Sequence, residues 1–75
     1  MNNQEKDIPK LFGEEIKRLR KEQGLSQIDL GVKIGADDRK IRRIESGDID
    51  TSFSTVVKLK KALNFSIDKF LKSIE

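Results

Sequence analysis

The sequence contains no cysteine, histidine, tryptophan or tyrosine. Without cysteine there are no disulfide bonds or thiolate metal sites, and without histidine the commonest general base and metal ligand are missing. No apolar run approaches the about 20 residues that a membrane-spanning helix needs, and the N-terminus lacks the apolar core of a signal peptide. We therefore expect a cytoplasmic protein that is not an enzyme and uses no metal, cofactor or small-molecule ligand.

The chain has 75 residues, the size of one small domain. Its 16 basic and 13 acidic residues give a net charge of +3, which does not by itself indicate a nucleic-acid partner. Residues 1–8 are mostly polar and are expected to form a flexible segment, with the domain over residues 9–75. Lys6 is the one basic residue before Lys10, which favours a frayed tail over an arm that contacts a partner.

Residues 26–45 have the pattern of two short helices joined by a tight turn. The serine that opens this stretch and Asp37 can each cap a helix, because their side-chain oxygens accept from free N–H groups of the first turn. Gly35 tolerates the positive φ that ends a helix in a tight turn. In the second helix Ile41 and Ile44 form the buried side, which leaves three arginines outside. Such a helix has the shape of an element that enters a DNA groove.

This stretch resembles the helix-turn-helix domains of lambdoid phage repressors and Cro-type regulators, the Xre-like family. The resemblance covers residues 11–71 and is carried by Leu25-Ser26-Gln27, Leu30-Gly31, Ile34-Gly35, Ile41 and Ile44-Glu45-Ser46-Gly47. It implies an all-α fold, a compact five-helix bundle. It also implies a sequence-specific transcription regulator, usually a repressor, encoded by a bacterium or phage and associated with the nucleoid.

Apolar residues at helical spacing predict the three other helices. The first is expected from Pro9 to about Gln23, ending at Gly24, with Glu14 and Glu15 supporting its solvated basic face and Glu14 spaced to pair with Arg18. The fourth is expected from Ser52 to about Leu63, with an inner face made of Phe53, Val56, either Leu59 or the aliphatic stem of Lys60, and Leu63. The fifth begins at Ser66, and its apolar residues are Ile67, Phe70, Leu71 and Ile74.

The resemblance assigns base reading to Asp38, Arg39 and Arg43, and contacts with the DNA backbone to Gln27, Lys40 and Arg42. Arginine pairs with guanine O6 and N7, whereas Asp38 can only accept, for example from cytosine N4. The alternative role of Asp38 is electrostatic, because an acid in the first turn complements the helix dipole. Arg42 is turned toward the side of the helix and is expected to meet phosphate.

The resemblance further implies a pair between Arg20 and Glu45 that ties the first helix to the third. As an exposed pair it would contribute about 0–1 kcal/mol, so its expected role is to orient the reading helix.

One short helix reads too few base pairs for useful specificity, so we expect a homodimer whose two reading helices lie about 34 Å apart on a pseudo-palindrome. A short fifth helix can bury only one face, so some of its apolar residues should remain for a partner subunit. The candidates are Phe65, Ile67, Phe70 and Ile74.

A protein-interaction module is the alternative function. Ile28 and Val32 stand where the family usually has polar residues, and they either pack locally, against Ile8, or form an apolar patch for a partner. Asp48 and Asp50 follow the reading helix, where many relatives carry basic residues, and they repel phosphate.

Overall fold

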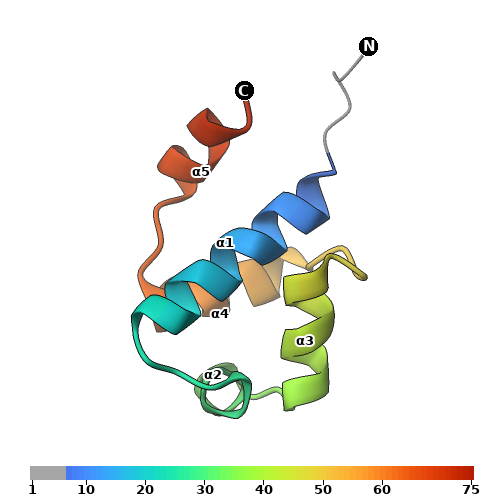
Figure 1. The fold of residues 1–75 in the computed structure, drawn as a ribbon, viewed down its shortest axis with the longest axis vertical. Helices are drawn as coiled ribbons and strands as arrows, with labels where there is room; N and C mark the ends of the chain where they lie inside the picture. The colour runs from blue at the N-terminus through green and yellow to red at the C-terminus, as the bar shows by residue number, and fades with distance from the viewer. Residues whose placement is uncertain (1–6) are drawn as a thin grey trace.

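The computed structural model describes residues 7–75, and this part of the chain folds into five helices (Figure 1). They are α1 (Ile8–Glu22), α2 (Gln27–Ile34), α3 (Asp38–Ser46), α4 (Phe53–Leu63) and α5 (Ile67–Ser73). The predicted all-α, five-helix architecture is confirmed. Ile8 already belongs to α1, which begins one residue before the expected Pro9. Lys6 and the rest of the expected N-terminal tail up to residue 6 lie outside the described residues.

Side-chain caps fix where the helices begin. Ser26 Oγ accepts from Asp29 N at 2.9 Å, while the Asp29 carboxylate accepts from Ser26 N at 2.9 Å, so α2 starts with a reciprocal capping box. Asp37 Oδ1 accepts from Lys40 N at 2.9 Å at the start of α3. Gly35 and Gly47, with φ of 74° and 79°, end these two helices in the left-handed conformation that glycine adopts without strain.

One apolar core joins the helices. Its buried members are Phe12, Ile16, Leu30, Ile34, Ile41, Ile44, Leu59, Leu63, Phe65 and Phe70. α1 packs against α3 and α4, and α2 packs against α3 and α4 (Figure 1). Phe12 also holds the C-terminal part of the chain, because its ring makes edge contacts with the rings of Phe65 and Phe70, each at 5.7 Å between centroids. Among the described helices, none has the length and apolar character needed to cross a lipid bilayer.

Three expectations about side-chain placement are wrong. Phe53 is 81% exposed, because it lies about 120° around α4 from the buried Leu59 at about 100° per residue. Ile28 and Val32 are 63% and 76% exposed on the outer side of α2, so they do not pack beneath the start of α1. Arg18 pairs with the carboxylates one turn before and after it, Glu15 and Glu22, instead of with Glu14.

Candidate DNA interface

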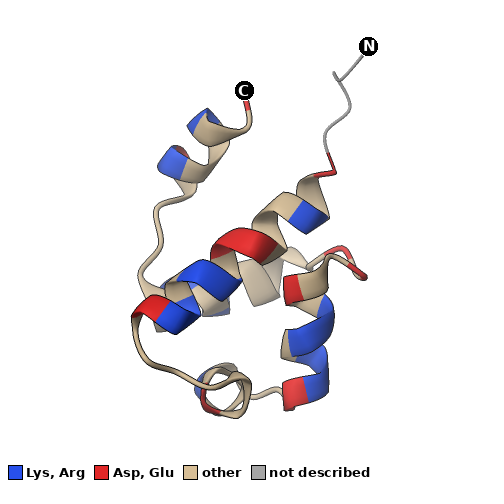
Figure 2. Ribbon diagram, in the orientation of Figure 1, with Lys and Arg blue, Asp and Glu red and all other residues tan. Residues whose placement is uncertain are grey.

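The lysine and arginine residues of α3 lie along the middle of the helix, and acidic residues lie near both of its ends (Figure 2). Ile41 and Ile44 are fully buried, and this fixes the rotation of the helix about its axis. Arg39 and Arg43, four residues apart, therefore share the side that faces solvent. Within residues 7–75, neither of them forms an ion pair, and both guanidinium groups are available to an external acceptor.

The two flanks of α3 differ in charge. On one flank Lys40 lines a shallow hollow together with Arg39, Arg43, Asp37 and Ile49, a residue of the loop before α4. Three cations and one carboxylate leave the hollow with a net positive charge beside one apolar wall, which suits a deoxyribose-phosphate unit or a base edge. The residue pattern gave no role to Ile49, and its only signal was one apolar residue between two aspartates in that loop.

On the other flank Asp38 and Arg42 form an ion pair. Arg42 Nη1 donates to Asp38 Oδ2 at 2.6 Å, and both side chains are about half exposed, at 54% and 41%. The hydrogen bond from Arg42 is the main cause that holds the pKa of the Asp38 carboxyl below its ordinary value. Two residues that were assigned separate roles, base reading and phosphate contact, are therefore in contact with each other.

A hydrogen-bonded network sets the position of α3 against α1 and α2. Arg20 donates from Nε to Glu45 Oε2 at 2.6 Å and from Nη2 to Glu45 Oε1 at 3.1 Å. Arg20 Nη1 also donates to the carbonyl oxygen of Leu25 at 2.7 Å, and Gln27 Nε2 donates to Glu45 Oε1 at 3.1 Å. The expected Arg20–Glu45 contact is present, but the assumption that it is exposed is wrong, because each residue is only 7% exposed.

Gly13 allows α1 and α3 to approach closely. A Cβ atom placed on Gly13 would lie 2.7 Å from the carbonyl oxygen of Glu45 and would also clash with the carbonyl oxygen of Ile44. The backbone of α1 therefore rests directly against the C-terminal end of α3. The network and this contact together hold α3 with its arginines outward.

The model of one protein family, described as helix-turn-helix, matches residues 16–70. The chain belongs to the Cro/C1-type helix-turn-helix family. This is a family of DNA-binding transcription regulators, which are typically not enzymes. The match spans α2 and α3, the motif itself, and it reaches α4 and most of α5.

Two relatives support the assignment. The crystal structure of the restriction-modification controller protein C.AhdI from Aeromonas hydrophila matches with a TM-score of 0.75 and 30% identity, over 85% of this chain and 96% of that one. An uncharacterised HTH-type transcriptional regulator of Acanthamoeba polyphaga mimivirus is 49% identical over 45 residues, which are 55% of this chain and 20% of that protein. The chain thus spans about a fifth of the length of this curated relative.

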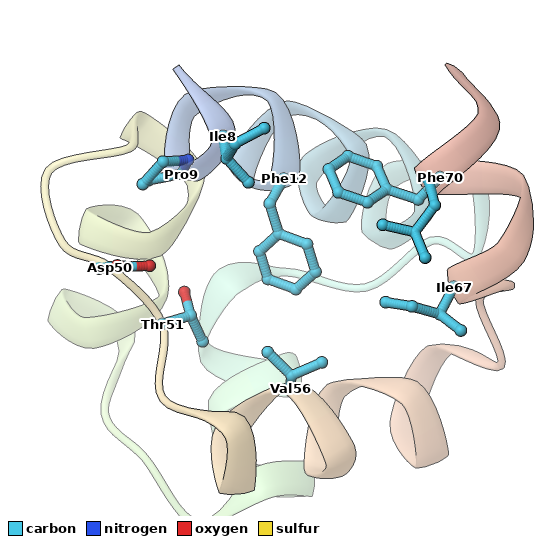
Figure 3. A pocket seen from close by; sticks show the side chains of 9 residues that line it. Ile8, Pro9, Phe12, Asp50, Thr51, Val56, Ile67 and Phe70 are labelled. Atoms are coloured by element: carbon cyan, nitrogen blue, oxygen red, sulfur yellow. The ribbon is translucent and has the colours of Figure 1, made fainter. Parts of the chain in front are cut away.

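The apolar residues in and just before α5 are partly buried in the core and partly exposed. Phe65 and Phe70 are 3% and 8% exposed, so the structure places these two dimer candidates in the core. Ile67 remains 38% exposed, and Ile74 is partly buried against the core. Ile67 lines a hollow of about 220 Å³ between α1, α4 and α5 (Figure 3). Its apolar rim also includes Leu71 of α5, which is half exposed and was not among the candidates.

Proposed function

We propose that the protein is a sequence-specific DNA-binding repressor that inserts α3 into the major groove of a pseudo-palindromic operator and binds it as a homodimer. The observation that carries this proposal is the pair Arg39 and Arg43, held outward by a buried isoleucine face and by the Arg20–Glu45 network. The family assignment and the similarity to a controller protein support the same function.

Base reading rests on Arg39 and Arg43. Each guanidinium can donate two parallel hydrogen bonds to O6 and N7 of guanine, and a good pair of this kind contributes about 1–3 kcal/mol of discrimination. Lys40 lies beside them and is suited to a phosphate on the edge of the groove. Gln27 stands at the start of α2, whose first N–H groups favour an anion, and it also braces Glu45.

The homodimer would use the exposed apolar surface of α5. Ile67 and Leu71 border the hollow next to α1, and Ile74 lies one turn further along the chain. Burying these side chains against the same surface of a second subunit would give the isologous contact that a two-fold axis requires. Two α3 helices could then read successive major grooves and occupy a promoter. We place this activity in the cytoplasm, beside the DNA that it controls.

A protein-interaction module is the second candidate, and two observations favour it. Ile28 and Val32 form an exposed apolar strip on α2. The loop after α3 is acidic because it contains Asp48 and Asp50, which repel phosphate (Figure 2). Salt dependence separates the two functions. Each phosphate contact changes the slope of log K against log salt by about −0.9, whereas binding through an apolar strip is nearly independent of salt.

The test is selection of bound duplexes from a random DNA pool, followed by titration of the selected duplex at several salt concentrations. We expect a two-fold symmetric consensus and a steep loss of affinity with salt. Failure to enrich any sequence, together with salt-independent binding, would contradict the proposal.

A further inference from the structure

The ion pair on α3 brings together two side chains of opposite charge at the edge of the reading surface. Asp38 is the first residue of α3, and Arg42 lies one turn later on the same flank. Their separation of 2.6 Å is as short as the Arg20–Glu45 contact in the buried network. Arg39 stands next to Asp38 in the chain and Arg43 next to Arg42, so the pair borders the strip that faces outward.

This geometry disfavours a simple phosphate contact for Arg42. A phosphate bound by the other N–H donors of Arg42 would lie close to the Asp38 carboxylate, and a phosphate that drew the guanidinium away would leave that carboxylate without its partner. A like charge beside phosphate is unfavourable. If the pair stays closed, the flank is nearly neutral and can lie in the groove. An ionised carboxylate has about four lone-pair sites, so Asp38 can accept a further hydrogen bond while it holds Arg42.

We propose that Asp38 and Arg42 read DNA as one unit, in which Arg42 positions the Asp38 carboxylate to accept from an exocyclic amino group in the major groove. The acceptor-only chemistry of the carboxylate selects cytosine N4 or adenine N6. Arg42 is thus a positioning residue. The inference rests on the proposed DNA-binding function and assigns the third position that α3 reads, beside those of its two outward arginines.

The experiment compares base preference, measured by selection from a random duplex pool and by affinities for single-base variants, in Asp38→Ala, Arg42→Ala and the double variant. Loss of either partner should remove the preference at the same base pair. The penalty for changing that base pair should fall from about five-fold or more to less than about two-fold. The double variant should lose no more of this base preference than either single variant, because one substitution alone already breaks the unit.

Two further variants serve as controls. Arg42→Lys keeps a cation that can reach Asp38 and should keep the preference at that base pair. Lys40→Ala removes a cation that is assigned to a phosphate on the opposite flank, so it should weaken binding to all duplexes alike and leave every base preference in place. Substituting cytosine or adenine at the affected position identifies which amino group is read.

Other results would overturn the inference. If Arg42→Ala weakens all duplexes alike, lowers the salt slope by about one unit and leaves the preference intact, Arg42 is a phosphate contact. Additive losses in the double variant would mean that the residues act separately. If the unmodified protein selects no sequence, the proposed function itself fails, whereas a selective protein that is insensitive to Asp38→Ala overturns only this inference.

A measurement without DNA tests the positioning step directly. NMR titration of the Asp38 carboxyl should give a higher pKa in Arg42→Ala than in the unmodified protein, because the hydrogen bond from Arg42 is the main cause of the lowered value. An unchanged titration would show that Arg42 does not hold the carboxylate in solution.

Discussion

Removing Arg20 should destabilise the domain far more than the loss of an exposed ion pair would. Its guanidinium makes three hydrogen bonds, two to Glu45 and one to the carbonyl oxygen of Leu25. In Arg20→Ala the buried carboxylate of Glu45 would keep, among residues 7–75, only the donor from Gln27. Breaking a buried pair by removing one partner costs about 3–5 kcal/mol. A chain of 75 residues has about 4–11 kcal/mol in total at about 0.05–0.15 kcal/mol per residue, so the variant should be close to unfolding.

Replacing both partners tests whether the unpaired, buried carboxylate of Glu45 causes this loss of stability. The double variant Arg20→Met/Glu45→Leu removes both charges and fills the space with apolar side chains, which is often neutral or stabilising. We expect it to recover most of the stability lost in Arg20→Ala. Its operator affinity should stay low, because Gln27 no longer has the acceptor that ties α2 to α3. The double variant would then be stable but would bind the operator weakly.

The assay is urea unfolding followed by circular dichroism at 222 nm, with operator affinity measured on the same samples. A cost below about 1 kcal/mol for Arg20→Ala would match an exposed pair and would refute the reasoning from burial. A double variant that loses the sum of the two single effects would also refute it.

Three further predictions concern packing, pH and assembly. Gly13→Ala should lower the free energy of unfolding by about 1–3 kcal/mol in a urea titration, because the new Cβ would meet the backbone of α3. A higher free energy of unfolding, which the greater helix propensity of alanine favours, would contradict this prediction. The pKa of Asp29 is lowered mainly by its hydrogen bond from the Ser26 backbone. Asp29 therefore stabilises the fold above its unfolded pKa of about 3.9, and this stabilisation disappears as the pH falls through the lower folded pKa. Asp29→Ala should accordingly lose less stability on acidification than the unmodified protein, and equal losses would refute the assignment. Ile67→Glu should shift sedimentation from dimer to monomer, whereas Val32→Glu, on a surface remote from α5, should not; a dimer that survives Ile67→Glu would place the interface elsewhere.

The helix boundaries were predictable because the signals that set them are local. Ser26, Asp37 and Ser66 each accept a hydrogen bond from the backbone N–H three residues later, and each begins a helix as expected. Gly35 and Gly47 end helices for an equally local reason, the positive φ that they adopt.

Two of the wrong expectations depend on distant partners, and a third depends on a choice among near ones. Phe65 lies in the connection before α5 and is buried because Phe12, from the other end of the chain, covers it. Arg20 and Glu45 are 25 positions apart in the chain, so spacing along the sequence gave no sign that their contact would be buried. Arg18 had several acids within one helical turn, and spacing alone could not choose among them.

The α3 residues were predictable in part. The isoleucine spacing gave the direction of Arg39 and Arg43, because two buried positions fix the rotation of a short helix. The Asp38–Arg42 pair was missed although the residues are four apart, since each had been given its own DNA contact. The close approach of α1 to α3 at Gly13 had no signal in the motif, because it depends on where the last carbonyl groups of α3 lie relative to α1.

Sequence selection with Arg39→Ala and Arg43→Ala, beside the unmodified protein, tests the central claim most directly. If α3 is the reading helix, each variant loses the preference for one guanine and about 1–3 kcal/mol of affinity for the selected operator, while the rest of the consensus is kept. If both variants select the same consensus as the unmodified protein, α3 does not read the DNA and the account is contradicted.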